Sequence, residues 1–266
     1  MRNNPKISIV TPSFNQGQFI EGTILSVLSQ TYRNIQYIVV DGCSTDNTMD
    51  IVNKYRDRIN IIIHEQDEGQ TDAINKGFKL ANGELVGWLN SDDILYPNCI
   101  EKIVDLYLDK PDGSVYYNAA IEIIDAKSSV VNKYRRIIPN RNHLLEINYD
   151  IVQQGSFYKR ELVEKVNYLD EKEHFCMDLD LWLKLSKIAP IYYLDVVPMS
   201  AFRLWEANKT STDLLIFLKD IRRILLKNGA SHVSPSVLRT YINYYREFIK
   251  IQLRRQNDLL RAHALN

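Results

Sequence analysis

The sequence has few cysteines, and they form no pattern. Cys43, Cys99 and Cys176 are odd in number, lie far apart and include no CxxC pair, which argues against a disulfide framework and a zinc site. An excess of charge of either sign is also missing, with 33 Lys and Arg against 33 Asp and Glu. Bulk charge therefore gives no reason to expect a nucleic-acid partner, and any basic surface must be local.

Long apolar runs are missing as well. No stretch approaches the roughly 18 apolar residues of a membrane span, and no signal-peptide pattern follows the first residues, so we expect a cytoplasmic protein. The glycine-rich patterns GxGxxG and GxxxxGK[ST] are absent, which leaves dinucleotide binding of that kind and a P-loop unsupported. A nucleotide would have to be held by side chains.

What the sequence does contain is a repeated alternation of strand and helix patterns. Residues 7–11, 35–40, 59–64 and 85–89 are short apolar runs typical of buried strands, and helical spacing of apolar residues follows each of the first three. Such units predict an α/β fold with a mostly parallel sheet flanked by helices. After about residue 112, shorter runs at 115–117, 120–124, 130–131 and 151–158 predict a mixed or antiparallel part.

Acidic residues gather where the fourth predicted strand ends. Asn90 and Ser91 are followed directly by Asp92 and Asp93. Ligands of parallel sheets collect beyond the carboxyl ends of the strands, and two adjacent carboxylates suit Mg²⁺ or Mn²⁺ that carries a diphosphate. The alternative is that Ser91 or Asp92 caps a helix beginning a few residues later, which would account for one acid but not both.

A further acidic pair lies in a predicted helix near residue 180. Asp178, Leu181 and Leu185 share one helical face, so Asp178 points with the core-facing stripe. An acid in that position is either an N-cap or a carboxylate presented into a cleft. Asp180 aligns with Lys184 on another face, and we expect it to be a solvated ion-pair partner.

The chain after residue 205 is predicted to form two helices, at 213–227 and from 234 to about 262. The second has an apolar stripe with bases alongside it: Leu238, Ile242, Tyr245, Ile249 and Leu253, with Arg239, Arg246, Lys250 and Arg254. We expect this helix either to pack on the domain or on another copy of the chain, or to lie on an anionic membrane surface. The predicted domains are residues 1–205 and a helical extension, 206–266.

Five motifs, in this order, resemble the family 2 glycosyltransferases with the GT-A fold. They are Ile9-Val10-Thr11-Pro12-Ser13-Phe14-Asn15, residues 40–48 (VDGCSTDNT), residues 67–77 (DEGQTDAINKG), Asn90-Ser91-Asp92-Asp93 and residues 177–182 (MDLDLW). The third and fourth together resemble the bacterial enzymes that build O-antigen and capsular polysaccharides. The resemblance covers roughly residues 6 to 205.

The resemblance implies roles for individual residues. Thr11, Pro12 and Asn15 match the loop that holds the nucleoside, and Asp41 matches the acid that hydrogen-bonds the base, usually uracil. The family's DxD motif falls on the loop that contains Asn90 and Ser91 and so contacts the donor; its last acid, which binds the metal, is Asp92, with Asp93 in support. Asp178 matches the catalytic base.

The sequence also departs from the family pattern. Asn90 stands where the first DxD acid often is, Met177 replaces a frequent Glu, and Trp205 stands where many members place a His near the diphosphate. Fewer protein charges would then hold the metal. Lys76 and Arg203 are candidate phosphate or acceptor contacts, with a structural or surface role as the alternative.

Together these residues predict a metal-dependent inverting hexosyltransferase. It would use Mn²⁺ or Mg²⁺ to move a sugar from a UDP-hexose or UDP-N-acetylhexosamine to a hydroxyl of a glycan, such as a polyprenyl-diphosphate-linked intermediate of surface polysaccharide synthesis. The helical extension would hold it on the cytoplasmic face of the inner membrane or join it into a homo-oligomer. Two alternatives are a sugar nucleotidyltransferase, whose glycine-rich basic first loop residues 11–17 lack, and a non-catalytic donor-binding protein, which needs no inward acid at Asp178.

Overall fold

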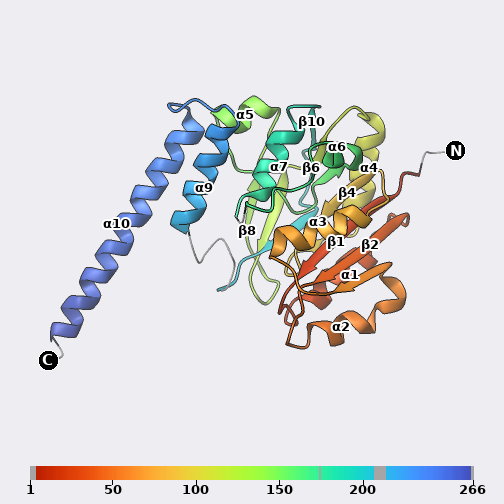
Figure 1. Cartoon of the computed structure of the whole chain (residues 1–266), viewed down its shortest axis with the longest axis horizontal. Helices are drawn as coiled ribbons and strands as arrows, with labels where there is room; N and C mark the ends of the chain where they lie inside the picture. Colours follow the sequence, from red (N-terminus) through yellow and green to blue (C-terminus); the bar gives the residue numbers. More distant parts are fainter. Residues whose placement is uncertain (1–3, 174, 207–213, 265–266) are drawn as a thin grey trace. The chain divides into compact units, whose positions relative to one another are not determined.

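The structure, a computed structural model, describes residues 4–173, 175–206 and 214–264, with side chains up to residue 253 (Figure 1). The chain divides into two compact units. The first comprises Met1–Arg141 and Asp150–Trp205, and the second Asn142–Tyr149 and Glu206–Asn266. The second unit thus includes a short segment, 142–149, that the sequence had not set apart from the first.

Four parallel strands form one half of the main sheet. They are β1 (Ile7–Ser13), β2 (Ile35–Asp41), β3 (Ile61–His64) and β4 (Leu85–Trp88), and β1 lies between β2 and β4. All residues of β1 and β4 are buried, as expected for strands covered on both faces. The predicted third strand begins later than residue 59, because the preceding η1 (Arg56–Arg58) is a 3₁₀ turn.

The other half of the seven-stranded sheet contains β6 (Val115–Asn118), β9 (Phe157–Lys159) and β10 (Ile191–Leu194). β9 runs antiparallel between β4 and β6, which confirms the mixed α/β sheet predicted from the sequence. The predicted strand at 151–158 is wrong over most of its length. Residues 151–156 form a loop and turn, with Gly155 at φ 75°, a conformation that a continuing strand does not adopt.

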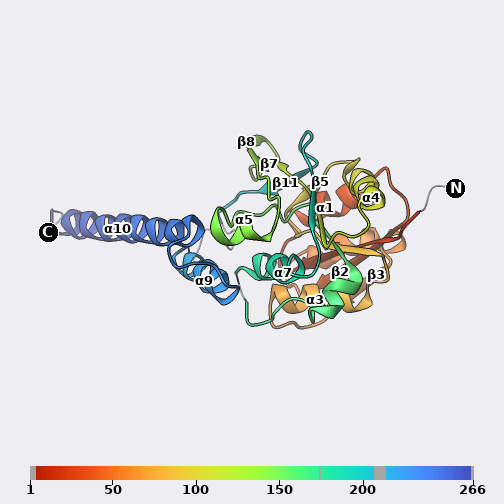
Figure 2. The same cartoon turned by 90° about the horizontal axis from the view of Figure 1, so that it is seen from above.

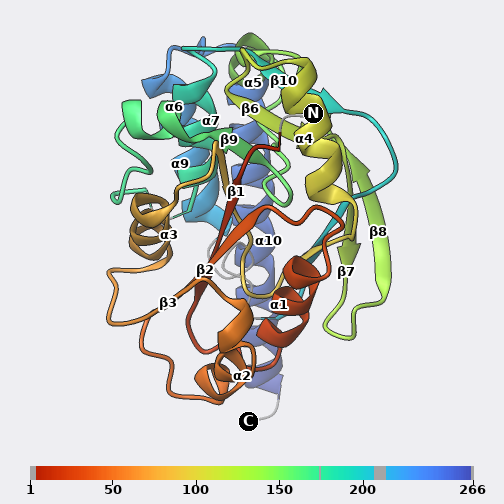
Figure 3. The same ribbon diagram turned by 90° about the vertical axis from the view of Figure 1, so that its right-hand side faces the viewer.

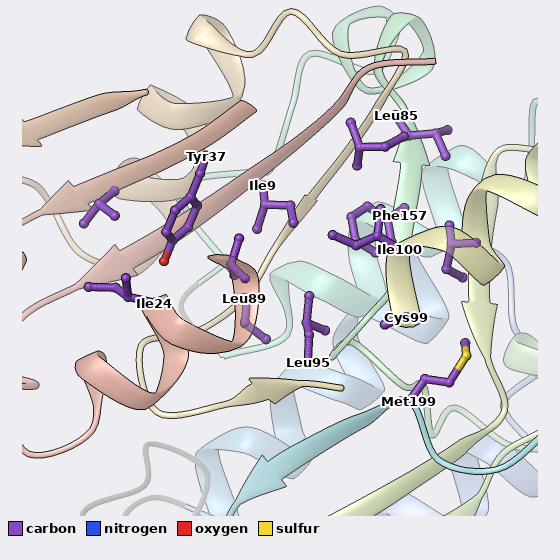
Figure 4. Close-up of a cluster of buried hydrophobic side chains, with 14 of the residues drawn as sticks. Ile9, Ile24, Tyr37, Leu85, Leu89, Leu95, Cys99, Ile100, Phe157 and Met199 are labelled. Atoms are coloured by element: carbon purple, nitrogen blue, oxygen red, sulfur yellow. The ribbon is translucent and has the colours of Figure 1, made fainter. Parts of the chain in front are cut away.

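Helices cover both faces of this sheet (Figure 2). One face carries α1 (Ile20–Leu28), α2 (Thr48–Lys54) and α4 (Cys99–Asp109). These helices and the strands share one apolar cluster, part of which Figure 4 shows: Ile9, Ile24, Tyr37, Leu89, Ile100 and Phe157.

The other face carries α3 (Gln70–Leu80), α6 (Arg160–Lys165) and α7 (Met177–Leu185). Here Trp88 of β4 packs edge-on against Phe78 of α3, with 5.9 Å between ring centroids. A Cβ at Gly77 would lie 2.4 Å from a methyl group of Val10. Only glycine therefore allows α3 to approach β1 this closely.

A second, four-stranded sheet lies beyond the end of β4, in the order β5-β11-β7-β8. Its strands are β5 (Ile94–Leu95), β7 (Ala120–Ile124), β8 (Val130–Arg135) and β11 (Ser200–Arg203). β7 and β8 form a hairpin (Figure 3). β5 begins directly after Asp93, and Arg203, the last residue of β11, donates its backbone N–H to the Asp93 carboxylate. This sheet therefore supports the loop that contains Asp92 and Asp93.

The second unit contains α9 (Leu214–Lys227) and α10 (Pro235–Ala264), which pack along each other, together with most of α5 (Arg141–Glu146). The buried residues of α9 recur at helical spacing: Leu218, Ile221, Ile224 and Leu225. In the described part of the chain, every helix is too short or too polar to cross a membrane. The helical extension predicted from the sequence thus consists of two amphipathic helices, α9 and α10, that pack along each other as a hairpin.

Candidate active site

The carboxyl ends of the parallel strands bring polar residues to one edge of the sheet. Ser13, Asp41 and His64 end β1, β2 and β3 and are neighbours in the strand register. Asp92 lies in the loop after β4, the strand on the other side of β1. Loops that are far apart in the sequence therefore meet at one edge of the sheet, the edge at which open α/β sheets bind ligands.

Asp41 is fully buried at this edge, and its carboxylate is held by two neighbours. Ser44 donates to it through its backbone N–H at 2.9 Å and through its hydroxyl at 2.6 Å. His64 Nδ1 lies 2.7 Å from Oδ2, and its ring is half exposed. Asp41 thus fixes the turn after β2 and the orientation of His64, a residue that sequence analysis missed.

The loop after β1 is tied to the same turn through Asn15. Its backbone N–H donates to the Ser44 hydroxyl at 2.7 Å, and its Oδ1 accepts from the backbone N–H of Thr45 at 2.8 Å. Asn15 has φ 50°, which Asn tolerates better than most residues. Thr11 and Pro12 are buried, and the Thr11 hydroxyl lies 3.1 Å from that of Tyr37.

Asp67 lies against the turn after β2, beside Gly42. A Cβ at Gly42 would lie 2.4 Å from Asp67 Oδ2, so the absence of a side chain at Gly42 lets the two loops approach. Asp67 Oδ1 accepts from the backbone N–H of Gly69 at 2.9 Å, and Gly69 has φ 113°, which favours glycine.

Asp92 is half-buried in the loop after β4, which lies on the other side of β1 from β2. Its Oδ2 accepts a hydrogen bond from the indole N–H of Trp205 at 2.9 Å. Burial raises the pKa of Asp92, and the Trp205 hydrogen bond and the positive charge of Arg203 oppose this shift. Trp205 therefore helps to keep Asp92 ionised.

Asp93, in contrast, is completely buried and its carboxylate is bound by the protein. Its Oδ1 accepts from the backbone N–H of Arg203 at 2.9 Å, and its Oδ2 accepts from Gln154 at 3.0 Å and Asn90 at 3.1 Å. Burial and the adjacent charge of Asp92 raise the pKa of Asp93 well above its usual value. These contacts make Asp93 the anchor of the loop that presents Asp92.

Arg203 and Lys76 are both engaged within the protein. Arg203 is buried, and its guanidinium donates to the carbonyl oxygens of Asp92 and Asp125 at 2.8 and 2.7 Å. Lys76 pairs with Glu65 at 3.0 Å and Asp72 at 3.3 Å. Of the two roles left open for each from the sequence, these contacts are those of structural cations.

Helix α3 connects the Asp92 loop to the segment that leads to α7. Its first residue, Gln70, donates to the side-chain oxygen of Asn90 at 2.8 Å, and the hydroxyl of Thr71 donates to the carbonyl oxygen of Glu173 at 3.1 Å. One turn later, Asn75 exchanges hydrogen bonds with both backbone groups of Leu169 at 3.0 and 3.1 Å. The Asn90 loop and the approach to Asp178 are therefore held by the same helix.

Asp178 lies in the first turn of α7 and is half-buried, whereas all but one of the other residues of this helix are buried. Its Oδ1 accepts from the backbone N–H of Leu179 at 2.8 Å. The prediction that Asp180 is solvated is wrong: Asp180 is 1% exposed and pairs with Lys184 at 2.6 Å. All residues of α7 except Asp178 and Lys184 are buried, so this helix has no solvent-exposed face opposite its core-facing one.

The residues after β4 can be tested for their fit to a divalent metal. Within the described residues, no three His, Cys, Asp or Glu side chains are grouped closely enough to form a metal cage. Ser91 is buried, and Asn90 is engaged by Gln70. The half-buried carboxylate of Asp92 fits an ion such as Mg²⁺, which is often held by one or two carboxylates, water and substrate phosphates.

The chain is similar to known proteins in sequence and in fold. The model of glycosyl transferase family 2 matches residues 8–166. An uncharacterized glycosyltransferase of Rickettsia typhi is 31% identical over 219 residues, which is 79% of this chain and 68% of the relative. The putative teichuronic acid biosynthesis glycosyltransferase TuaG of Bacillus subtilis is 37% identical over 109 residues, 40% of this chain and 43% of its own length.

Two solved structures have a similar fold. Residues 1–349 of S. aureus TarS, in complex with UDP-GlcNAc, give a TM-score of 0.64 at 21% identity, covering 85% of this chain and 68% of that TarS fragment. The mannosyltransferase PcManGT from Pyrobaculum calidifontis in complex with GDP-Man and Mn²⁺ gives 0.66 at 16% identity, covering 92% and 70%. The fold is thus that of a GT-A glycosyltransferase. The chain belongs to glycosyl transferase family 2, as its motifs predicted.

Proposed function

We propose that this protein is an inverting glycosyltransferase that moves a hexose or N-acetylhexosamine from UDP to a hydroxyl of a glycan, a lipid-linked intermediate in surface polysaccharide synthesis. The UDP-GlcNAc complex of TarS supports the donor class. The name of TuaG, a putative teichuronic acid biosynthesis enzyme, supports the type of product.

The donor would bind across the strand ends. Asn15 and the turn held by Asp41 form one side, where the nucleoside would lie, with Asp67 above Gly42. Asp92, after β4, would lie beside the diphosphate. A divalent ion held there by Asp92 would neutralise the charge that develops on the leaving UDP. Asp93 supports Asp92 through the loop and keeps its own oxygens on protein donors.

Asp178 would act as the catalytic base. In the proposed step the acceptor oxygen forms a bond to the anomeric carbon as the bond from that carbon to UDP breaks, and the hydroxyl proton passes to the Asp178 carboxylate. Attack from the face opposite UDP inverts the anomeric configuration. The observation that carries this proposal is a half-exposed carboxylate on an otherwise enclosed helix, tied through α3 to the Asp92 loop.

Asp178→Asn tests the assignment. Because general-base catalysis contributes roughly 10²- to 10⁴-fold, transfer to an acceptor should fall by about that factor, while UDP binds as before. Asp57→Asn, an exposed acid of η1, is the control and should leave both properties unchanged. Near-normal transfer by Asp178→Asn would remove Asp178 from the role. UDP-sugar binding without UDP release in any acceptor mixture would favour a non-catalytic donor-binding protein.

A further inference from the structure

The hairpin of α9 and α10 leaves a continuous apolar stripe in contact with solvent. Seven large apolar side chains on one side of α10 are exposed, from 37% at Tyr241 to 59% at Ile242 and Tyr245. The stripe consists of Leu238, Tyr241, Ile242, Tyr245, Phe248, Ile249 and Leu253. The opposite side of α10 packs along α9, with Val237 and Thr240 fully buried. Patches of this kind mark interaction sites in soluble proteins.

Basic side chains border this stripe on both sides. Arg246 and Lys250 lie along one edge, by helical spacing, and Lys250 pairs with Glu247 of the same helix at 2.5 Å. Along the other edge α9 contributes Lys219, 5.3 Å from the ring of Tyr244, and Arg222, 4.1 Å from the ring of Tyr241. An apolar stripe between two rows of cations is the pattern of a helix that lies in a membrane interface.

Charge is concentrated on this helix. Residues 235–264 contain six Lys and Arg against two Asp and Glu, a net charge of +4, whereas the whole chain is neutral. The start of α10 is fixed to its own unit: the Ser236 hydroxyl donates to the carbonyl oxygen of Leu144, and Arg239 donates to Asn148. The stripe is therefore presented by an anchored helix.

We propose that the α9–α10 hairpin binds an anionic lipid surface through this stripe. A second copy of the chain is the main competitor for an apolar helix face. Because both edges are basic, a second copy docked in either direction would bring like charges together. Phosphate headgroups instead complement both edges. This inference does not depend on the sugar, the acceptor or the reaction assigned to the first unit.

Sedimentation with vesicles tests the proposal on the full chain. Vesicles of equal parts phosphatidylglycerol and phosphatidylcholine should bind the protein at least about tenfold more tightly than pure phosphatidylcholine vesicles. Raising the salt from ~0.1 M to ~1 M shortens the screening length from about 10 Å to about 3 Å and should release most of it. Equal binding to both vesicle types, or none to either, would overturn the proposal.

Two double variants locate the contact. Ile242→Ser with Ile249→Ser removes apolar area, and Arg246→Glu with Lys250→Glu reverses one edge; each should lower binding to anionic vesicles about tenfold or more. The matched controls change exposed residues elsewhere: Val131→Ser with Val197→Ser, and Lys102→Glu. These should bind like the unmodified protein, and equal losses in controls and variants would contradict the assignment.

Light scattering without lipid distinguishes the second copy. We expect a concentration-independent mass that Ile242→Ser with Ile249→Ser does not change. A dimer that this variant dissociates, in a protein that ignores anionic vesicles, would assign the stripe to self-association. The helical circular dichroism and the thermal unfolding midpoint of each variant, measured in the same preparations, separate failure of the lipid contact from misfolding of the chain.

Discussion

The indole N–H of Trp205 donates to Oδ2 of Asp92 at 2.9 Å. The Trp205 ring also packs edge-on against Phe19, with 5.0 Å between ring centroids, so residues 19, 92 and 205 form one contact group. At a position where the family often has a histidine, this chain thus has a donor that orients the carboxylate. Trp205 thus fixes the orientation of the Asp92 carboxylate.

If Asp92 holds a divalent metal as proposed, Trp205→Phe should raise the pH at which UDP binds together with that metal. Metal binding requires the ionised carboxylate, and the lost hydrogen bond is one of the contacts that lower the pKa of Asp92. Because the hydrogen bond from Trp205 stabilises the ionised carboxylate, its loss should move the midpoint to higher pH. Calorimetric titration of UDP with Mn²⁺ across pH values measures it. An unchanged midpoint would show that Trp205 does not tune Asp92.

Asp93→Asn should remove a pH dependence of stability. The pKa of Asp93 is raised well above its ordinary value of 3.8 by burial and by Asp92, so the folded protein holds this proton more tightly than the unfolded chain. The associated stability is fully present below about pH 3.8 and is lost as pH rises through the interval up to the folded pKa.

Each pKa unit of that interval corresponds to about 1.4 kcal/mol. Asn cannot ionise, so the free energy of unfolding of Asp93→Asn, measured with urea from acid to neutral pH, should decline less than that of the unmodified protein. Parallel pH curves for the two proteins would contradict the assigned pKa direction.

Asn75→Ala should both destabilise the protein and slow transfer. Asn75 is buried and bonds both backbone groups of Leu169, and unpaired buried groups cost roughly 1–3 kcal/mol each. We expect a loss of about 2–4 kcal/mol in the free energy of unfolding, and a lower kcat with unchanged UDP affinity, since the segment leading to Asp178 loosens. Asn53→Ala, an exposed residue of α2, is the control; UDP affinity falling in step with kcat would place the damage at the donor site instead.

Gly42→Ala should weaken UDP binding without unfolding the protein. The new methyl group would meet Asp67 Oδ2 at 2.4 Å, and that half-buried side chain must move away from the proposed nucleoside site. We expect at least a tenfold loss of affinity, equal to about 1.4 kcal/mol, with little change in thermal midpoint. Gly22→Ala, on the exposed side of α1 with open space around it, should leave UDP binding unchanged and stabilise the helix by about 0.5–1 kcal/mol. Equal UDP affinity in both variants would place the nucleoside elsewhere.

The sequence by itself determined the parallel half of the sheet, because its strands are buried on both faces and therefore read as apolar runs such as residues 7–11 and 85–89. It also determined the family, since motifs at fixed places in the chain do not depend on knowing the fold. The strand predicted at 151–158 was wrong because apolar residues alone do not distinguish a strand from a buried loop with Gly155 at positive φ.

Only the tertiary structure decided what the acids do. Asp92 and Asp93 are neighbours in the sequence, but their carboxylates have different surroundings. Asp92 is half-buried and accepts a hydrogen bond from Trp205, 113 residues away. Asp93 is buried among Asn90, Gln154 and the backbone of Arg203. Asp178 and Asp180 divide in the same way, half-exposed against buried. The sequence shows which residues carry a carboxylate. How exposed each carboxylate is, and which groups bond to it, depends on segments that come together only when the chain folds.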